Sequence, residues 1–375
     1  MAGIYIHIPF CKQKCIYCDF YSNTSTYYQE TVDLLCKELE QRKDYLQAAP
    51  VKTVYMGGGT PSLLSPELLA QIYRTIAHNY DLSMCEEFTI EANPDDLSEE
   101  YLQSLCRQVP LNRISMGIQS FNDEELLFLC RRHSARQAEE AVQRCRKAGI
   151  TNISIDLMYG LPIQTLDGWH ANIEKAIALN VPHISAYHLS VEAGTALALK
   201  IKKGELCEID EDKSTAMYRL LVRKMKEAGY THYEISNFAI DPHYSKHNTS
   251  YWQNIPYLGI GPGAHSYNRH SRQWNIASLY KWMDTVNGKA NHVETETLTT
   301  DMKYNEYIMT RLRTIWGISF EEVNTEFGGK YHRHLVKQSL PYRRNRLLLP
   351  APDDRLCLSE EALFISDRII GDLII

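Results

Sequence analysis

The sequence lacks a long apolar run, a secretion signal and an excess of charge of one sign. No stretch of about 18 apolar residues is present, so a membrane-spanning helix is not expected. The first residues alternate like a strand, without the basic segment, apolar segment and cleavage site of a signal peptide. Forty basic side chains stand against 46 acidic ones, so the net charge of −6 gives no overall field that would attract nucleic acid.

The ten cysteines lack the spacing of a disulfide framework. We therefore expect a cytoplasmic protein that binds no nucleic acid.

Length and hydrophobic periodicity predict an α/β protein. Domains usually have roughly 100–200 residues, so a chain of 375 residues predicts two or three of them. In the first part of the chain, short β-branched or aromatic runs alternate with amphipathic stretches, which is typical of βα units around a parallel sheet. The six predicted strands are residues 3–9, 52–58, 86–93, 112–120, 152–160 and 183–191. In such sheets, functional side chains gather just beyond the carboxyl ends of the strands.

Two regions follow the predicted βα domain of residues 1–230. Residues 231–295 are rich in aromatic residues with Pro and Gly between them, and we interpret them as a connecting region. Residues 296–375 have helical patterns followed by a small hairpin, which predicts a smaller α+β, winged-helix-like C-terminal domain. Its densest basic cluster, at 342–346, is interpreted as a solvated turn rather than a phosphate-binding site.

Three cysteines, Cys11, Cys15 and Cys18, lie within eight residues directly after the first predicted strand. Buried apolar thiols would be unusual at this spacing on a loop. Structural zinc needs four ligands, and His7 or Asp19 would have to complete such a site because no second cysteine pair follows. A [4Fe–4S] cluster normally takes four thiolates, so three leave one iron open for a substrate or cofactor. We predict that the three cysteines are metal ligands, and the open iron favours the cluster.

The ends of the other predicted strands carry groups that suit a binding site. The second strand ends in glycines 57–59, whose backbone can approach a ligand closely, although a tight turn alone can require glycine. Glu91 and Gln119 end the third and fourth strands. Asp156 lies within an apolar strand and needs a partner or a ligand, because burying an unpaired charge is costly. A structural pair with Arg131 is the alternative for Asp156, but together these groups favour a functional site.

The CxxxCxxC motif after the first strand of a βα domain resembles the radical S-adenosylmethionine (SAM) superfamily. The resemblance implies a partial (β/α)6 TIM-like barrel in which SAM binds the open iron of a [4Fe–4S] cluster and is cleaved to a 5′-deoxyadenosyl radical. The motifs YIHIPFC, GGGTPS, EANP, GIQSF and IDLMYGLPIQT are similar to those of the coproporphyrinogen dehydrogenases, in order, across residues 5–165. The residues that this resemblance implies as SAM contacts are Tyr5, Tyr17, Gly58, Gly59, Thr60, Glu91, Gln119, Arg131 and Asp156.

Three features differ from the coproporphyrinogen dehydrogenases. Phe20 stands where those enzymes carry a fourth cysteine, the cysteine loop begins at residue 11 without room for their N-terminal extension, and HNTSYW occupies residues 247–252. In these respects the chain resembles the HemW family of heme chaperones. That resemblance implies that the chain binds heme and delivers it to respiratory apoproteins. The alternative is an oxygen-independent coproporphyrinogen III oxidase of porphyrin biosynthesis, so the resemblance leaves open whether the chain is an enzyme.

The heme-binding side chain is less well indicated than the cysteines. His247 is the candidate, because histidine is a common axial ligand of heme iron, and Tyr251 and Trp252 could pack on a porphyrin. Alternatively, His247 lies in a polar surface loop that these two aromatic residues anchor. The competing histidines are His243, His265 and His270.

Further functions and partners receive less support from the sequence. A radical methyltransferase that opens heme for iron release is a third relative of the same group. The C-terminal domain could instead be an adaptor for a protein or a nucleic acid. A homodimer and peripheral contact with a membrane stay open alternatives.

Overall fold

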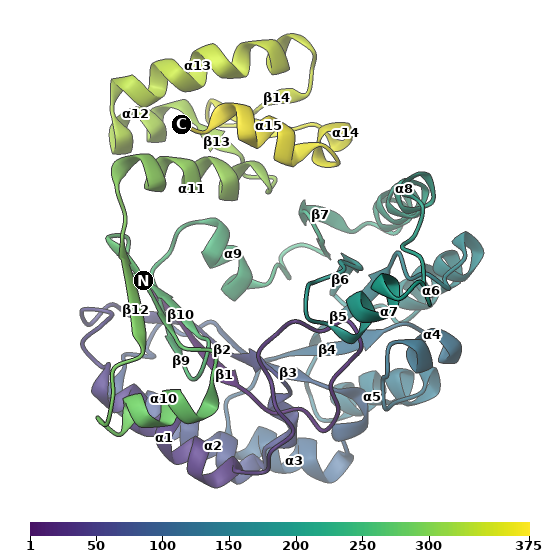
Figure 1. Ribbon diagram of the computed structural model, residues 1–375, viewed down its shortest axis with the longest axis vertical. Coiled ribbons are helices and arrows are strands. Elements are labelled where there is room, and N and C mark those ends of the chain that lie inside the picture. The colour runs from purple at the N-terminus through teal and green to yellow at the C-terminus, as the bar shows by residue number, and fades with distance from the viewer.

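One twelve-stranded sheet organises most of the chain in the computed structural model, which describes all 375 residues (Figure 1). Its central strands run parallel, in the order β1, β2, β3, β4, β5, β6. Their bounds are β1 Ala2–Ile8, β2 Val51–Gly58, β3 Glu87–Ala92, β4 Arg113–Gln119, β5 Asn152–Tyr159 and β6 His183–His188. The six strands predicted from the sequence are confirmed within three residues at each end. The order of strands does not close on itself, so the sheet is a partial barrel, as the family resemblance implied.

Helices cover the outer face of this sheet (Figure 1). They are α1 Tyr28–Gln41, α2 Pro66–Asn79, α3 Glu99–Gln108, α4 Asp123–Phe128, α5 Ala135–Lys147, α6 Leu166–Ala178, α7 Ala196–Lys202 and α8 Glu211–Glu227. Most begin at a Ser, Thr, Asn or Asp whose side chain accepts a hydrogen bond from the first turn. At α5, Ser134 and Gln137 form a reciprocal capping box, which fixes where the helix starts.

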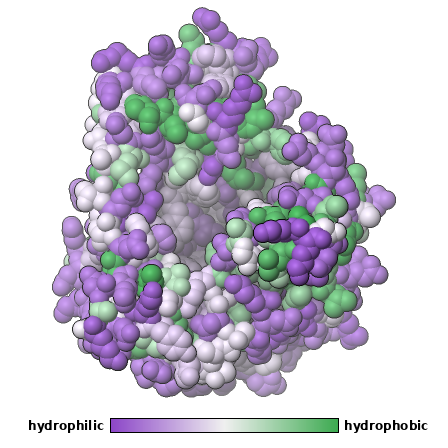
Figure 2. Space-filling model, viewed as in Figure 1, coloured by the Kyte–Doolittle hydropathy of each residue, from purple (hydrophilic) through white to green (hydrophobic).

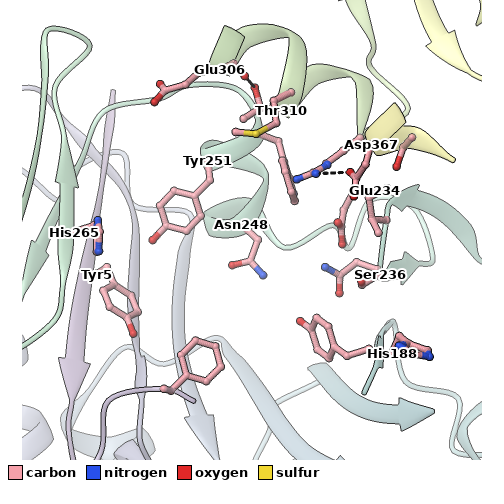
Figure 3. Close-up of a pocket in the computed structure, with 18 of the residues that line it drawn as sticks. Tyr5, His188, Glu234, Ser236, Asn248, Tyr251, His265, Glu306, Thr310 and Asp367 are labelled. Atoms are coloured by element: carbon pink, nitrogen blue, oxygen red, sulfur yellow. Dashed lines mark hydrogen bonds and ion pairs between the residues drawn. The ribbon is translucent and has the colours of Figure 1, made fainter. Parts of the chain in front are cut away.

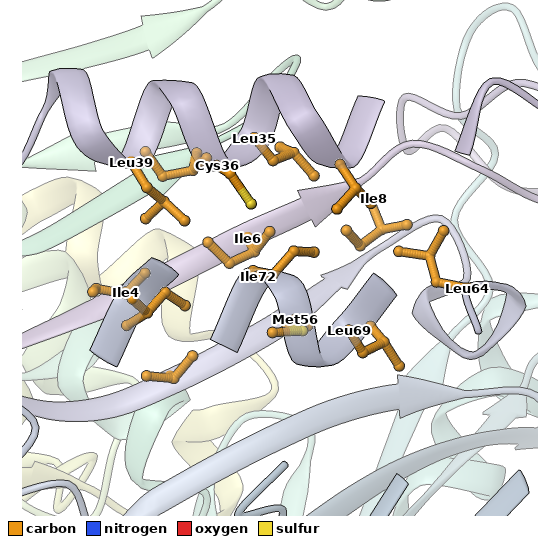
Figure 4. Packing of buried hydrophobic residues seen from close by; sticks show 14 of the residues in the cluster. Ile4, Ile6, Ile8, Leu35, Cys36, Leu39, Met56, Leu64, Leu69 and Ile72 are labelled. Atoms are coloured by element: carbon orange, nitrogen blue, oxygen red, sulfur yellow. The ribbon is translucent and has the colours of Figure 1, made fainter. Parts of the chain in front are cut away.

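The core lies between these helices and the sheet. Figure 4 shows Ile4, Ile6 and Ile8 of β1 packed with Leu35 of α1 and Ile72 of α2. Each such side chain stabilises the fold by about 1.5–3 kcal/mol through burial. Cys36 lies in the same core and Cys145 in the neighbouring one.

The connecting region that we expected over residues 231–295 instead extends the sheet at both edges, with its last strand ending at Thr297. The elements are β7 Thr231–Glu234, β8 Asn237–Ala239, α9 Lys246–Trp252, β9 Tyr257–Ile260, β10 His265–Tyr267, β11 Ser271–Asn275, α10 Leu279–Val286 and β12 Val293–Thr297. Strand β9 pairs parallel to β1, and β8 pairs antiparallel to β6. Strands of three to five residues are too short to show a period, so the sequence did not indicate them. The domain boundaries at 230 and 295 stay a prediction.

The last part of the chain has a separate hydrophobic core and a three-stranded sheet of order β13, β15, β14. Its elements are α11 Thr300–Leu312, β13 Ile318–Ser319, α12 Phe320–Phe327, α13 Gly329–Arg344, β14 Leu348–Ala351, β15 Arg355–Leu358, α14 Glu360–Leu363 and α15 Ser366–Leu373. Helices with a small hairpin were predicted here, and Figure 1 shows them above the open side of the partial barrel. Among all the helices, none combines the length and the apolar character that crossing a membrane would require.

Candidate functional site

The three cysteines lie on the loop that follows β1. Backbone hydrogen bonds hold this loop, from Cys11 N–H to the Asn23 carbonyl at 2.9 Å and from Cys18 N–H to the Cys15 carbonyl at 3.3 Å. The three thiols are neither fully buried nor fully exposed. They line a cavity of about 560 Å³ at the carboxyl ends of the parallel strands, which we call the cysteine-loop cavity.

Polar groups from loops elsewhere in the chain reach the thiols. The Thr60 hydroxyl donates to Cys11 Sγ at 3.5 Å, and the Arg131 guanidinium donates to Cys15 Sγ at 3.4 Å. Burial raises the pKa of the Cys18 thiol, so its thiolate needs a cation or a metal to stabilise it. No group of three or more His, Cys, Asp or Glu side chains converges to hold a single metal ion.

The cysteine-loop cavity gathers eight of the nine residues that the resemblance implied as SAM contacts. They are Tyr17, Gly58, Gly59, Thr60, Glu91, Gln119, Arg131 and Asp156. Tyr5 is the ninth, and it lines a second, larger cavity next to this one. The rule that functional groups gather at strand carboxyl ends explains why residues so far apart in the sequence meet here.

The glycine run at the end of β2 packs tightly against its surroundings. Gly58 has a φ of +102°, which glycine adopts without strain. A Cβ on Gly57 would lie 2.9 Å from the Glu91 carboxyl group, and one on Gly59 would lie 2.5 Å from the Phe10 carbonyl oxygen. Packing within the protein therefore requires glycine at this turn, and the same lack of side chains would let a ligand approach the backbone closely.

Two carboxyl groups in this cavity have raised pKa values. Burial is the main cause at Glu91, whose pKa rises to about 7 although its carboxylate accepts hydrogen bonds from the Tyr55 hydroxyl (2.7 Å) and Gly58 N–H (3.0 Å). Burial also raises the pKa of Asp156 to about 6, against an opposing hydrogen bond from Ser185. No ion pair joins Asp156 to Arg131, so the structural pair considered as an alternative is absent.

Gln119 and Arg131 carry polar atoms without a protein partner. Gln119 Oε1 and Arg131 Nε are buried and make no hydrogen bond. Gln119 also has a φ of +70°, an unusual conformation for a residue with a side chain and one that concentrates at functional sites. Nη2 of Arg131 donates to Asn93 Oδ1 and to the Gly117 carbonyl, so the side chain is held in place. Unsatisfied buried groups in such a cavity indicate a missing polar ligand.

A second cavity of about 1290 Å³, here called the large cavity, lies between the sheet and the C-terminal helices. It is the hollow at the centre of the face shown in Figure 2. In Figure 3, Tyr5 and His265 lie on its left side, and His188, Ser236 and Glu234 on its right. The residues shared with the cysteine-loop cavity are Asp19, Phe20, Tyr187 and His188. Phe20, at the position of the missing fourth cysteine, is 70% exposed between the two cavities.

His247 lies outside both cavities. It is fully buried in α9, and burial lowers its pKa to about 3. Its Nδ1 shares a hydrogen bond with the Thr53 hydroxyl and its Nε2 shares one with the Tyr251 hydroxyl, both at 2.8 Å. The alternative that His247 lies in a surface loop is wrong. Tyr251 and Trp252 of the same motif do line the large cavity.

The other candidate histidines differ in their placement. His243, His265 and His270 are all exposed, but of the three only His265 lies on the wall of the large cavity. Sequence reasoning did not find Asn93, which holds Arg131, or Tyr55, which donates to Glu91. Asn93 follows a predicted strand within EANP and could have been found by the strand-end rule. Tyr55 carries no such signal because it lies inside a strand.

Comparisons with known proteins agree with this geometry. The family model described as the radical SAM superfamily matches residues 5–176. Coproporphyrinogen III oxidase (HemN) from Escherichia coli, described as a radical SAM enzyme, superposes with a TM-score of 0.86 over 100% of this chain and 90% of that chain. The sequence identity to it is 20%, so this likeness concerns the fold. Fold and site together define a radical SAM protein, a class that implies a [4Fe–4S] cluster and SAM as cofactors.

Relatives with higher identity narrow the class. The heme chaperone HemW of Lactococcus lactis is 33% identical over 97% of this chain and 95% of its own length. The heme chaperone HemW of Bacillus subtilis is 38% identical over 89% of this chain and 88% of its own length. A zebrafish relative, the mitochondrial radical S-adenosyl methionine domain-containing protein 1, is 35% identical over 70% of this chain. The chain belongs to the HemW heme chaperone family, as its motifs predicted.

Proposed function

We propose that this protein holds a [4Fe–4S] cluster on Cys11, Cys15 and Cys18, binds SAM beside it, and carries heme in the large cavity for delivery to an apoprotein. The single observation that carries the proposal is that two cavities lie side by side and share part of their lining. One cavity contains the thiols and the strand-end polar groups. The other is large and rich in aromatic side chains.

The residues of the cysteine-loop cavity fit a cluster with a polar cofactor. The three thiols line the cavity without forming a group that could hold a single metal ion, which suits ligands for the separate corners of a cube. When bound, such a cluster supplies an open iron and an electron to its cofactor. The Arg131 guanidinium would stabilise a thiolate at Cys15, and the unpartnered Gln119 Oε1 would receive a donor from SAM. Glu91 and the glycine turn would hold the charged amino-acid end of SAM.

The large cavity fits a tetrapyrrole in size and lining. Cavities for drug-sized ligands usually measure about 300–1,000 Å³, and this one is larger. Tyr5, Tyr251, Trp252 and Tyr257 offer apolar rings with polar edges, which can pack on a porphyrin plane. The heme chaperone names of the relatives support heme as the occupant and its delivery to an acceptor.

A heme titration tests the proposal. We expect the anaerobically reconstituted protein to bind one heme per chain. When a heme-free respiratory hemoprotein is added and takes up the heme, the Soret band should shift to that of the loaded acceptor. Thr310→Trp would fill part of the large cavity and should weaken binding at least ten-fold. Lys303→Trp is the matched control, since Lys303 lies on the same helix but outside the cavity. Equal binding by both variants would place heme elsewhere.

An oxygen-independent coproporphyrinogen III oxidase is the second candidate, because the two cavities share a wall and a porphyrinogen in one would lie beside SAM in the other. Incubation with SAM, a reductant and coproporphyrinogen III separates the two functions. Protoporphyrinogen formation would establish the enzyme, whereas unchanged substrate supports the chaperone. Cytoplasmic location, a homodimer and membrane contact stay predictions.

A further inference from the structure

We infer that His265 is the axial ligand of the heme iron and that His247, the histidine of the HNxxYW motif, is a positioning residue that acts through Tyr251. This inference rests on the proposed function, because it assigns the ligand within the large cavity.

Three histidines line the large cavity, and two of them are already engaged. His7 is buried, with Nδ1 3.1 Å from the Tyr5 hydroxyl and Nε2 2.8 Å from the Tyr21 carbonyl oxygen. His188 Nε2 shares a hydrogen bond of 2.7 Å with the Ser214 hydroxyl. The His265 side chain makes no hydrogen bond with the protein, although it lies on the cavity wall. It is therefore the histidine on this wall with both ring nitrogens free.

The strand that carries His265 points it into the cavity. In β10 the central residue, Ser266, is fully buried, and its hydroxyl is hydrogen-bonded to Gly259, so the residues on either side face the other way. Trp274 on the paired strand stacks on the imidazole, with ring centroids 5.7 Å apart and planes 19° apart. This stacking restricts the orientation of the imidazole ring.

The surroundings of His265 also suit a heme. Burial and the nearby Arg272 guanidinium lower the pKa of His265, which keeps the imidazole neutral, the form that coordinates metals. Arg272 pairs with Glu306 at 2.8 Å, and its buried Nε has no partner. A propionate carboxylate of the porphyrin could accept from that N–H.

His247 is placed to hold an aromatic residue and not to reach iron. Both ring nitrogens are taken, by Thr53 and by Tyr251, and its side chain is fully buried. Through the second of these bonds it fixes the Tyr251 hydroxyl at the edge of the large cavity. Coordination by His247 would require breaking a buried hydrogen bond and moving α9.

Spectroscopy of heme-loaded variants tests this assignment. In full-length protein with its cluster, His265→Ala should lose the histidine-ligated signature in the ferric absorbance and electron paramagnetic resonance spectra and bind heme at least ten-fold more weakly. Added imidazole should restore the signature. His247→Gln should keep the signature with a binding loss of about three-fold, and Tyr251→Phe should behave the same way if His247→Gln fails to fold. His270→Ala, an exposed site nearby, is the control and should match the wild type.

Two kinds of failure can be told apart. If the wild-type protein takes up no heme, the proposed function fails and this inference fails with it. If the wild type binds heme and His265→Ala retains its spectrum and affinity, only the ligand assignment is overturned. Loss of the histidine signature in His247→Gln or Tyr251→Phe, with His265→Ala unchanged, would assign the iron to α9 instead.

Discussion

The Glu87 carboxylate accepts a hydrogen bond of 3.0 Å from the backbone amide of His247, 160 residues later in the chain. It also accepts one from the Lys246 amide at 2.9 Å, so a negative charge on β3 meets the N-terminus of α9, where the helix dipole favours it. On its other side lies the guanidinium of Arg113, which is buried and has Nε 4.0 Å from the same carboxylate. The buried Glu87 carboxylate therefore fixes α9, the helix that carries the HNxxYW motif, to strand β3.

Glu87→Ala should therefore destabilise the protein strongly. The change removes the ion-pair partner of the buried Arg113 and the acceptor of two hydrogen bonds from α9, so we expect a loss of about 3–5 kcal/mol in the free energy of unfolding. Urea denaturation measures this. Glu86→Ala is the matched control, because Glu86 pairs with Lys52 and Lys246 at the surface and should cost less than about 1 kcal/mol. Similar costs for the two variants would mean that Glu87 does not hold α9.

Replacing any one of the three loop cysteines should remove the cluster. Cys11→Ser, Cys15→Ser and Cys18→Ser each eliminate a thiolate, and serine oxygen is a poor ligand for iron in such clusters. We expect iron and sulfide to fall to near zero, together with the visible absorbance, after anaerobic reconstitution. Cys207→Ser, at an exposed cysteine far from the loop in sequence, should keep full iron and sulfide. Full iron content in the triple variant would show that other residues hold the metal.

A methyl group at Gly59 should disturb the cysteine loop. Its Cβ would lie 2.5 Å from the Phe10 carbonyl oxygen and 2.8 Å from that of Ile8, and these backbone atoms cannot simply rotate away. We expect Gly59→Ala to lower stability by about 1–3 kcal/mol through overpacking and to reduce the cluster content. Gly371→Ala, where a Cβ meets nothing within 4 Å inside α15, should instead raise stability by about 0.5–1 kcal/mol. Thermal denaturation measures both effects. Melting temperatures that shift in the same direction in the two variants would contradict this prediction.

The buried carboxyl of Glu91 should make stability depend on pH. Its folded pKa is about 7, above the ordinary 4.5, so the folded state holds the proton more tightly and the wild type loses stability as pH rises between these values. Glu91→Gln lacks this loss. Without added SAM, we expect the variant to gain about 2 kcal/mol relative to the wild type between about pH 5 and about pH 8.

Glu100→Gln provides a control for that measurement, because the pKa of Glu100 is shifted in the opposite direction. A hydrogen bond from its own backbone amide at the start of α3 lowers the pKa of Glu100, so the wild type gains stability as its carboxylate ionises. That gain is nearly complete by about pH 5, so the difference between Glu100→Gln and the wild type should stay flat between about pH 5 and about pH 8, where the Glu91→Gln difference changes. If the difference in unfolding free energy between Glu91→Gln and the wild type does not change with pH, then Glu91 ionises in the folded protein without a cost in stability.

The local sequence pattern was enough to predict the parallel strands and to name most of the polar groups at their ends. Glu91, Gln119 and Asp156 were predicted to share a site because each belongs to a parallel strand, and parallel strands end at the same edge. The short strands β7 to β12 escaped prediction, since their pairing depends on edges that the barrel provides. His247 was named as a heme-binding residue from its motif, and its burial behind Tyr251 follows from contacts with Thr53 and Glu87, far away in sequence.

The sequence by itself determined the chemistry of this protein: a three-cysteine loop after the first strand, the strand-end groups that accompany it, and the membership of the HemW family. These depend on residue type and short spacing, which the chain carries locally. The tertiary structure alone decided which histidines line the large cavity and that His247 is buried in a helix outside it. Burial and hydrogen bonding depend on what packs against a side chain, and those neighbours come from strands more than one hundred residues away.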